Sequence, residues 1–124
     1  MKKRSEKREQ FLKDVLVTGV ETYGYTPWFQ FGDYDPDNGT VTVWHDEKED
    51  GKYSDGPYYV TLDKIASALS KYRKQVAALP DGGRNTYAYQ LVVADRTNGD
   101  DGDYDVTTAD AIMQIAVLGE DIYG

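Results

Sequence analysis

An amphipathic pattern between residues 64 and 79 constrains this chain more than any other feature of its sequence. Apolar side chains recur there every three or four positions, which places them on one face of an α-helix. Asp63 stands where an N-cap is expected, and the run from Pro80 to Gly83 ends the helix. The helix must bury its apolar face against another element. That face consists of Ile65, Leu69, Tyr72, Val76 and Leu79.

Two further helices are predicted near the ends of the chain. Residues 5–20 carry an apolar face that includes Phe11 and Leu12, with Gly19 and Gly24 as stop signals. Residues 108–123 form the last helix, and Thr107 to Asp110 fits a capping box in front of it. The side chains that this last helix is expected to bury are Ile112, Ile115, Ala116, Gly119 and Ile122.

Between the first two helices the sequence predicts strands. Tyr25 to Tyr34 is aromatic and extended in character, the turn DPDNG follows at 35–39, and residues 40–44 alternate as a return strand. A polar loop at 46–57 leads to a third short strand, Tyr58 to Leu62. Residues 86–95 fit a strand and a helix equally well. The predicted fold is α+β, a small antiparallel sheet of a hairpin plus one or two further strands packed against three or four helices.

Length and composition favour one domain over residues 1–124, with residues 1–6 as a candidate disordered basic arm. The absence of cysteine excludes disulfides, thiolate zinc sites and cysteine nucleophiles. No apolar run approaches the roughly 20 residues of a membrane span, and no apolar segment follows the basic N-terminus as in a signal peptide. A soluble protein of the cytoplasm is expected, with no membrane partner.

The net charge of −8 is concentrated in two segments. Residues 33–55 hold eight acidic and two basic side chains, and residues 95–121 hold eight acidic and one basic. Such a chain repels nucleic-acid phosphates and attracts basic partners, so direct nucleic-acid binding is not expected. The candidate partner-binding residues are Asp100, Asp101, Asp103 and Asp105, with a second patch at Asp46, Glu47, Glu49 and Asp50.

The acidic run at residues 98–111 has several interpretations. No register of it supplies the ligands and the glycine of an EF-hand calcium loop, although an irregular Ca²⁺ or Mg²⁺ site stays open. Its second half fits helix capping. Helix capping does not require Asp100, Asp101 and Asp103 as well. With the nearby Asp95, these residues form either a solvated loop or a recognition surface.

No catalytic residue and no cofactor are predicted. His45 is the only histidine, and we expect it on the surface at a strand end, because its neighbours Asp46 and Glu47 need not point toward it. Serine-nucleophile and phosphate-loop motifs do not occur. Eleven tyrosines suggest either an aromatic core or a binding face. They and the other aromatic residues gather near two strands, as Tyr23, Tyr25, Trp28, Phe29, Phe31 and Tyr34 and as Tyr53, Tyr58 and Tyr59.

Three stretches carry a resemblance to a known family: FLKDVLVTGVE, YVTLDKIASAL and ADRTNGDDGDYDVTTADAIMQIAVLGEDIYG, which ends in the tail Gly119 to Gly124. Together they resemble a family of small uncharacterised proteins of actinobacterial phages, prophages and mobile elements. The resemblance implies a phage-borne protein in the bacterial cytoplasm, and it carries over no site residue.

These observations predict a non-enzymatic acidic binding protein that occupies a host macromolecule. The host protein could be one that binds nucleic acid, inhibited by carboxylates that imitate phosphates. Such mimicry requires the two acidic segments to lie side by side. A structural or assembly module that forms a homodimer is the second hypothesis, and a divalent-metal-binding protein or enzyme is the third.

Overall fold

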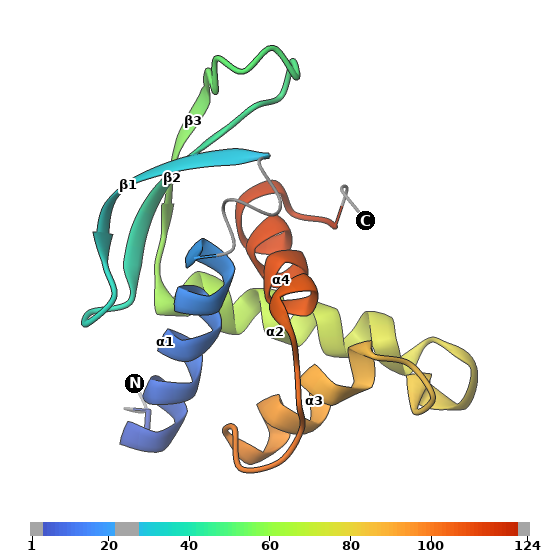
Figure 1. Ribbon diagram of the computed structural model, residues 1–124. Helices are drawn as coiled ribbons and strands as arrows, with labels where there is room; N and C mark the ends of the chain where they lie inside the picture. Colours follow the sequence, from blue (N-terminus) through green and yellow to red (C-terminus); the bar gives the residue numbers. More distant parts are fainter. Residues whose placement is uncertain (1–3, 22–27, 122–124) are drawn as a thin grey trace.

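The chain folds into a three-stranded antiparallel sheet packed on one side against four α-helices, in a computed structural model that describes residues 4–21 and 28–121 (Figure 1). This confirms the α+β prediction. In the described residues the elements are α1 (Glu6–Glu21), β1 (Phe29–Asp35), β2 (Thr40–His45), β3 (Asp55–Val60), α2 (Leu62–Ala77), the 3₁₀ turn η1 (Pro80–Gly83), α3 (Ala88–Thr97) and α4 (Val106–Leu118).

The sheet has the strand order β1-β2-β3, and the predicted hairpin forms its first two strands. Phe29 pairs with His45, and the connecting turn uses Gly39 at φ +70°. The third strand begins at Asp55, where it pairs with His45, and so starts earlier than predicted. It also ends earlier, at Val60, because Thr61 already belongs to the cap of α2. The part of the predicted first strand from residue 25 to 27 lies outside the described residues.

Helix α2 has the predicted apolar face but a different N-cap. Thr61 has extended backbone angles, and its hydroxyl accepts a hydrogen bond from the Lys64 N–H, which is the geometry of an N-cap. Asp63 lies inside the first turn instead, where its carboxylate pairs with Arg4 at 2.7 Å. Leu79 lies beyond the helix end and is 42% exposed, so it does not join the buried face.

Gly19 does not stop α1, as the sequence suggested, but lies buried inside it. A Cβ atom at this position would collide with Met113 of α4 and would crowd the Ala109 carbonyl. The missing side chain therefore allows α1 and α4 to approach each other closely. Gly24, the second predicted stop signal, lies outside the described residues.

Residues 86–95, for which the sequence predicts a strand and a helix equally well, are mostly helical and belong to α3. Leu91, Val92 and Asp95 are buried, as the helical alternative places them on one face. The helix ends at Asn98, which adopts the left-handed conformation at φ +53°.

Helix α4 begins two residues before the predicted start. Asp105 is its N-cap and accepts from the Thr108 N–H at 3.0 Å, while the Thr108 hydroxyl accepts from the Asp105 N–H. The capping box is therefore Asp105 with Thr108, not Thr107 with Asp110. The helix ends at Leu118, and Gly119 forms an exposed C-cap at φ +84° instead of joining the core. Ile122 lies outside the described residues.

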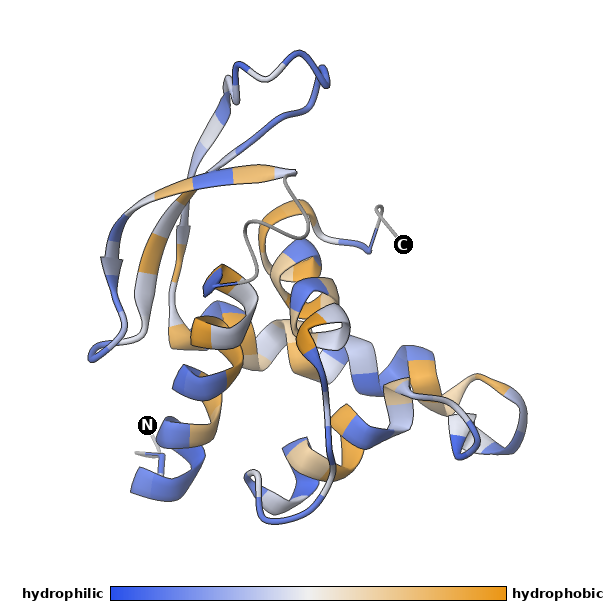
Figure 2. Cartoon of the chain, in the orientation of Figure 1, coloured by the Kyte–Doolittle hydropathy of each residue, from blue (hydrophilic) through white to orange (hydrophobic). Residues whose placement is uncertain are grey.

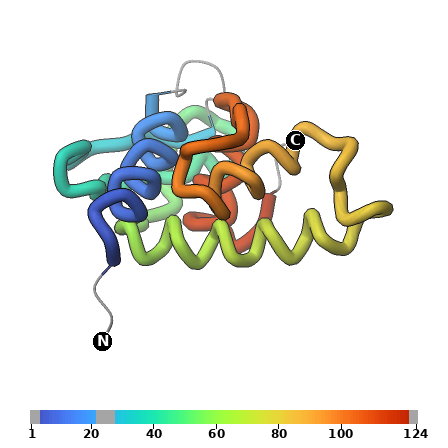
Figure 3. The backbone as a smooth tube through the Cα atoms, turned by 90° about the horizontal axis from the view of Figure 1, so that it is seen from below, coloured from blue at the N-terminus to red at the C-terminus, as the bar shows by residue number. Residues whose placement is uncertain are grey.

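The core lies between the sheet and the helices, where the apolar residues of Figure 2 gather. From the sheet it includes Phe29, Val41, Val43 and Val60, each at most 2% exposed. Helix α2 runs along one side of the molecule and contacts α1, α4, η1 and α3 (Figure 3). None of the helices in the described ranges is long and apolar enough to cross a membrane.

Candidate protein-binding face

The two predicted patches lie at opposite ends of the molecule. The loop between β2 and β3, residues 46–54, extends beyond one end of the sheet, whereas the connection between α3 and α4, residues 98–105, lies below the helices (Figure 1). The eight candidate residues therefore do not form one acidic face. The sequence shows how much charge each segment carries, but the chain path decides where each segment lies.

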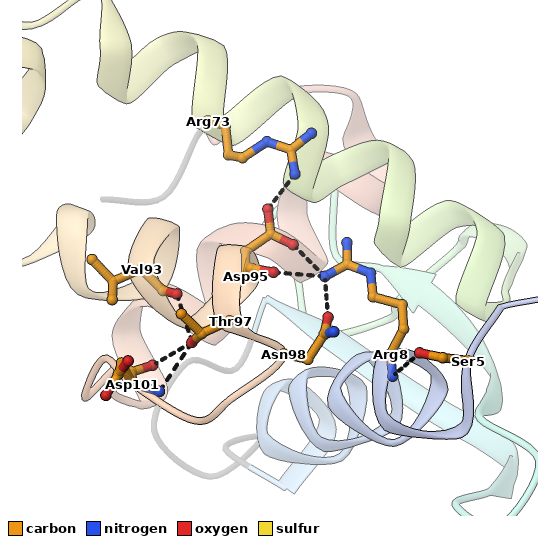
Figure 4. Close-up of polar contacts among 8 residues, drawn as sticks. All are labelled: Ser5, Arg8, Arg73, Val93, Asp95, Thr97, Asn98 and Asp101. Carbon is orange, nitrogen blue, oxygen red and sulfur yellow. Dashed lines mark hydrogen bonds and ion pairs between the residues drawn. The ribbon is translucent and has the colours of Figure 1, made fainter.

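Asp95, counted with the acidic run, is part of the interior. Its side chain is fully buried, with Oδ1 2.6 Å from Arg8 Nη1 of α1 and Oδ2 2.5 Å from Arg73 Nη1 of α2 (Figure 4). Arg8 also donates to the Asp95 backbone oxygen and to Asn98 Oδ1. This carboxylate joins three helices, because burying it requires neutralising partners.

The remaining carboxylates of the α3–α4 connection are partly engaged as well. Asp100 forms an ion pair with Lys7 of α1, and Asp105 caps α4. Asp101 and Asp103 are exposed, and neither takes part in an ion pair with another described residue. Asp103 borders a shallow depression beside Tyr87. Asp101 and Asp103 are therefore the two carboxylates of the first predicted patch that neither pair with a described cation nor cap a helix.

The second predicted patch is a tight acidic loop. Asp46 Oδ1 accepts hydrogen bonds from the N–H groups of Asp50 and Gly51, both at 3.1 Å, so this carboxylate holds the loop together. Glu47, Glu49 and Asp50 are exposed. From residue 46 to residue 55 there are five acidic and two basic side chains, and Figure 2 shows the loop in hydrophilic colours. We call residues 46–54 the acidic loop.

A hydrogen-bonded clasp closes the base of the acidic loop. His45 Nδ1 lies 3.2 Å from Asp55 Oδ2, and the Tyr58 hydroxyl donates to the same oxygen at 2.7 Å. The Tyr58 hydrogen bond, with a contribution from His45, lowers the pKa of the Asp55 carboxyl despite some burial. His45 is 5% exposed, which corrects its predicted surface position, because its ring faces inward and meets the edge of Trp28.

The outer face of the sheet, turned away from the helices, presents two aromatic side chains. Val43 and His45 of β2 are buried on the inner side, so Trp44 between them points outward. On β3, Tyr59 is paired with Thr42 and is 64% exposed. We call Trp44 and Tyr59 the aromatic face. Trp28, Phe29 and Val60 belong to the interior instead.

Sequence reasoning missed Trp44, although the alternation of β2 contains the signal. Once Val41 and Val43 are assigned to the core, Thr42 and Trp44 must lie on the other side. The tyrosine counts indicated the strands, but they did not indicate which side of the sheet the aromatic side chains occupy. Of the aromatic residues predicted around the strands, those at 23 and 25 lie outside the described residues.

The described residues contain no group of three or more histidine, cysteine, aspartate or glutamate side chains placed to hold a metal ion. Comparison with protein-family models, with curated proteins and with solved structures gives no match. The resemblance to actinobacterial phage proteins therefore stays a prediction.

Proposed function

We propose that this chain is a non-enzymatic binding protein that occupies a basic protein of a bacterial host in the cytoplasm, through the aromatic face and the adjoining acidic loop. The observation that carries the proposal is the exposed Tyr59, which pairs with Thr42 and so lies on the same side of the sheet as Trp44. Aromatic residues of this kind dominate protein interfaces, because they contribute large contact areas at a low cost in conformational entropy.

Charge selects the class of partner. The acidic loop begins two residues after Trp44, and its exposed carboxylates Glu47, Glu49 and Asp50 stand at one end of the aromatic face. A basic protein surface is attracted to such a loop and is oriented by it. A phosphate-like row across both predicted patches is not part of this proposal, because the loops that carry them lie at opposite ends of the molecule.

The homodimer alternative uses the same aromatic face with a second copy of the chain. Two copies would bring two acidic loops of equal charge to one interface, which opposes association at low salt. Sedimentation of the purified protein at low and high salt separates the two functions. A monomer at both salt concentrations supports the proposal, and a stable dimer through Tyr59 would replace it.

Affinity capture from bacterial lysate tests the proposal when matched variants are compared. Tyr59→Ser should lose the protein captured by the wild type, whereas Tyr87→Ser should retain it. Tyr87 is 80% exposed, and it precedes α3 at the end of α2 away from the sheet, so it controls for the loss of any exposed tyrosine.

A charge reversal adds a second pair of variants. Replacing Glu47, Glu49 and Asp50 by lysine should abolish capture, and the same change at Asp101 and Asp103 should not. Wild-type capture should weaken as salt rises, because exposed charges are screened. Retained binding by the loop variant would contradict the proposal, and loss through the Asp101 and Asp103 changes would move the binding site to the other end of the molecule.

A further inference from the structure

The indole ring of Trp44 spans the outer face of the sheet, from one neighbouring strand to the other. A Cβ atom on Gly56 of β3 would lie 3.1 Å from Trp44 Cδ1, and one on Gly32 of β1 would lie 3.4 Å from Trp44 Cζ3. The five-membered edge of the ring therefore rests beside β3 and the benzene edge beside β1. Both sites are glycines, which leaves the ring room to lie against the backbone.

The Trp44 side chain keeps part of its surface in contact with solvent. In the described part of the chain, the cation that lies over a ring is Arg8, over Phe11 in the helical layer, and no lysine or arginine covers Trp44. The exposed part of the indole is available to a group from another molecule.

We propose that the exposed part of Trp44 binds an arginine side chain of the partner, with the guanidinium stacked on the indole and attracted by the acidic loop. This inference rests on the proposed function and names the side chain that the aromatic face recognises. Tryptophan is the best aromatic partner for a cation, and a guanidinium adds planar stacking that an ammonium group lacks.

The position of the acidic loop supports a cation at this place. Asp46 follows Trp44 by two residues, and its carboxylate holds the turn that carries Glu47, Glu49 and Asp50. The clasp of His45, Asp55 and Tyr58 fixes the loop to the end of the same two strands. A cation over the indole therefore approaches a net negative segment held on a rigid base.

The test uses three synthetic peptides of ten residues that differ only at three positions, which hold arginine, lysine or citrulline. Citrulline keeps the planar shape of arginine without its charge. Each peptide is titrated into the ¹⁵N-labelled protein, and the two indole N–H resonances are followed. The arginine peptide should shift the Trp44 resonance to saturation and leave that of Trp28 in place, because Trp28 is 6% exposed.

Binding should weaken from arginine to citrulline by at least the roughly 2- to 30-fold of one cation–π contact, because citrulline also loses the attraction to the acidic loop, and lysine should lie between them. Replacing Glu47, Glu49 and Asp50 by their amides should weaken the arginine peptide further, whereas Asp101→Asn with Asp103→Asn should not. Trp44→Leu should remove the arginine preference. If that variant does not fold, the three-peptide comparison on the wild type still decides the question.

An unchanged Trp44 resonance, or equal affinity for the three peptides, overturns this inference. The proposed function stands separately in that case if Tyr59→Ser still loses the captured partner. Conversely, an arginine preference at Trp44 together with unchanged capture by Tyr59→Ser would support the arginine site and contradict the proposed binding surface.

Discussion

Arg73 of α2 reaches the buried carboxylate of Asp95 on α3, with Nη1 2.5 Å from Oδ2. On the opposite side of the same carboxylate, Arg8 of α1 completes a cluster that connects three helices. The Arg8 and Arg73 side chains are 24% and 44% exposed, so both cations keep contact with water while the anion does not. The stability of this cluster therefore depends most on the buried anion.

We predict that Asp95→Asn lowers the free energy of unfolding by about 1–3 kcal/mol, less than the about 3–5 kcal/mol of a fully buried pair, because the arginines stay partly hydrated. Arg73→Met should cost under about 1 kcal/mol, since Arg8 still neutralises the carboxylate. Urea unfolding measures both. Asp103→Asn is the control and should change the free energy of unfolding little. If Asp95→Asn changed it no more than this control does, Asp95 would not stabilise the cluster of the three helices.

The start of α4 gives a second prediction. Asp105→Ala should destabilise the protein by about 0.5–2 kcal/mol, because the Thr108 N–H loses its acceptor. Thr107→Ala should have a much smaller effect, since residue 107 is exposed and lies after the cap. Thermal and urea unfolding of the two variants separate the observed capping box from the one expected from sequence. If Thr107→Ala destabilised the protein more than Asp105→Ala, the capping box predicted from the sequence, Thr107 with Asp110, would be the correct one.

The repeating patterns of the sequence predicted the type of most elements but not their ends. The face of α2 with Ile65, Leu69 and Val76 is buried as expected. Its cap was misassigned because Thr61 and Asp63 both have capping side chains, and only the backbone conformation distinguishes them. The apolar residues at 86–95 match both the period of a strand and the period of a helix. The chain forms the helix, in which Leu91 packs into the core and Asp95 reaches two arginines.

The Gly19→Ala variant tests the close approach of α1 and α4. In an exposed helix, Gly→Ala stabilises by about 1 kcal/mol through helix propensity. Here the added methyl group would meet Met113 and the Ala109 carbonyl, so we predict a net loss of about 1–3 kcal/mol from overpacking. Urea unfolding measures the change. A stabilised Gly19→Ala variant would show that the two helices separate at little cost.

The candidate site was harder to predict than the fold, because it depends on directions that charge counts do not contain. In the sequence, Asp95 looks like a member of an acidic surface and Asp110 like part of a capping box, yet they are 2% and 3% exposed. Asp110 accepts a hydrogen bond from the Trp28 indole at 2.8 Å, a contact across 82 residues. Trp44 was identifiable only after the core side of β2 was assigned.

The last prediction concerns the clasp at the base of the acidic loop. In Tyr58→Phe the Asp55 carboxylate loses the hydrogen bond that does most to lower its pKa, so this pKa should rise toward the ordinary value of 3.8. Carboxyl ¹³C NMR measures the titration directly. Tyr59→Phe is the matched control, because no hydrogen bond links the Tyr59 hydroxyl to the clasp, and it should leave the Asp55 titration unchanged.

The lowered pKa also fixes how this contact depends on pH. A carboxyl group whose pKa is lower in the folded state stabilises the protein above its unfolded-state pKa, and this stabilisation is lost as the pH falls through the folded-state value. Tyr58→Phe should therefore be less stable than the wild type at about pH 6, and the difference should shrink below about pH 3. A difference that stays constant across this range would mean that Tyr58 stabilises the sheet by packing alone.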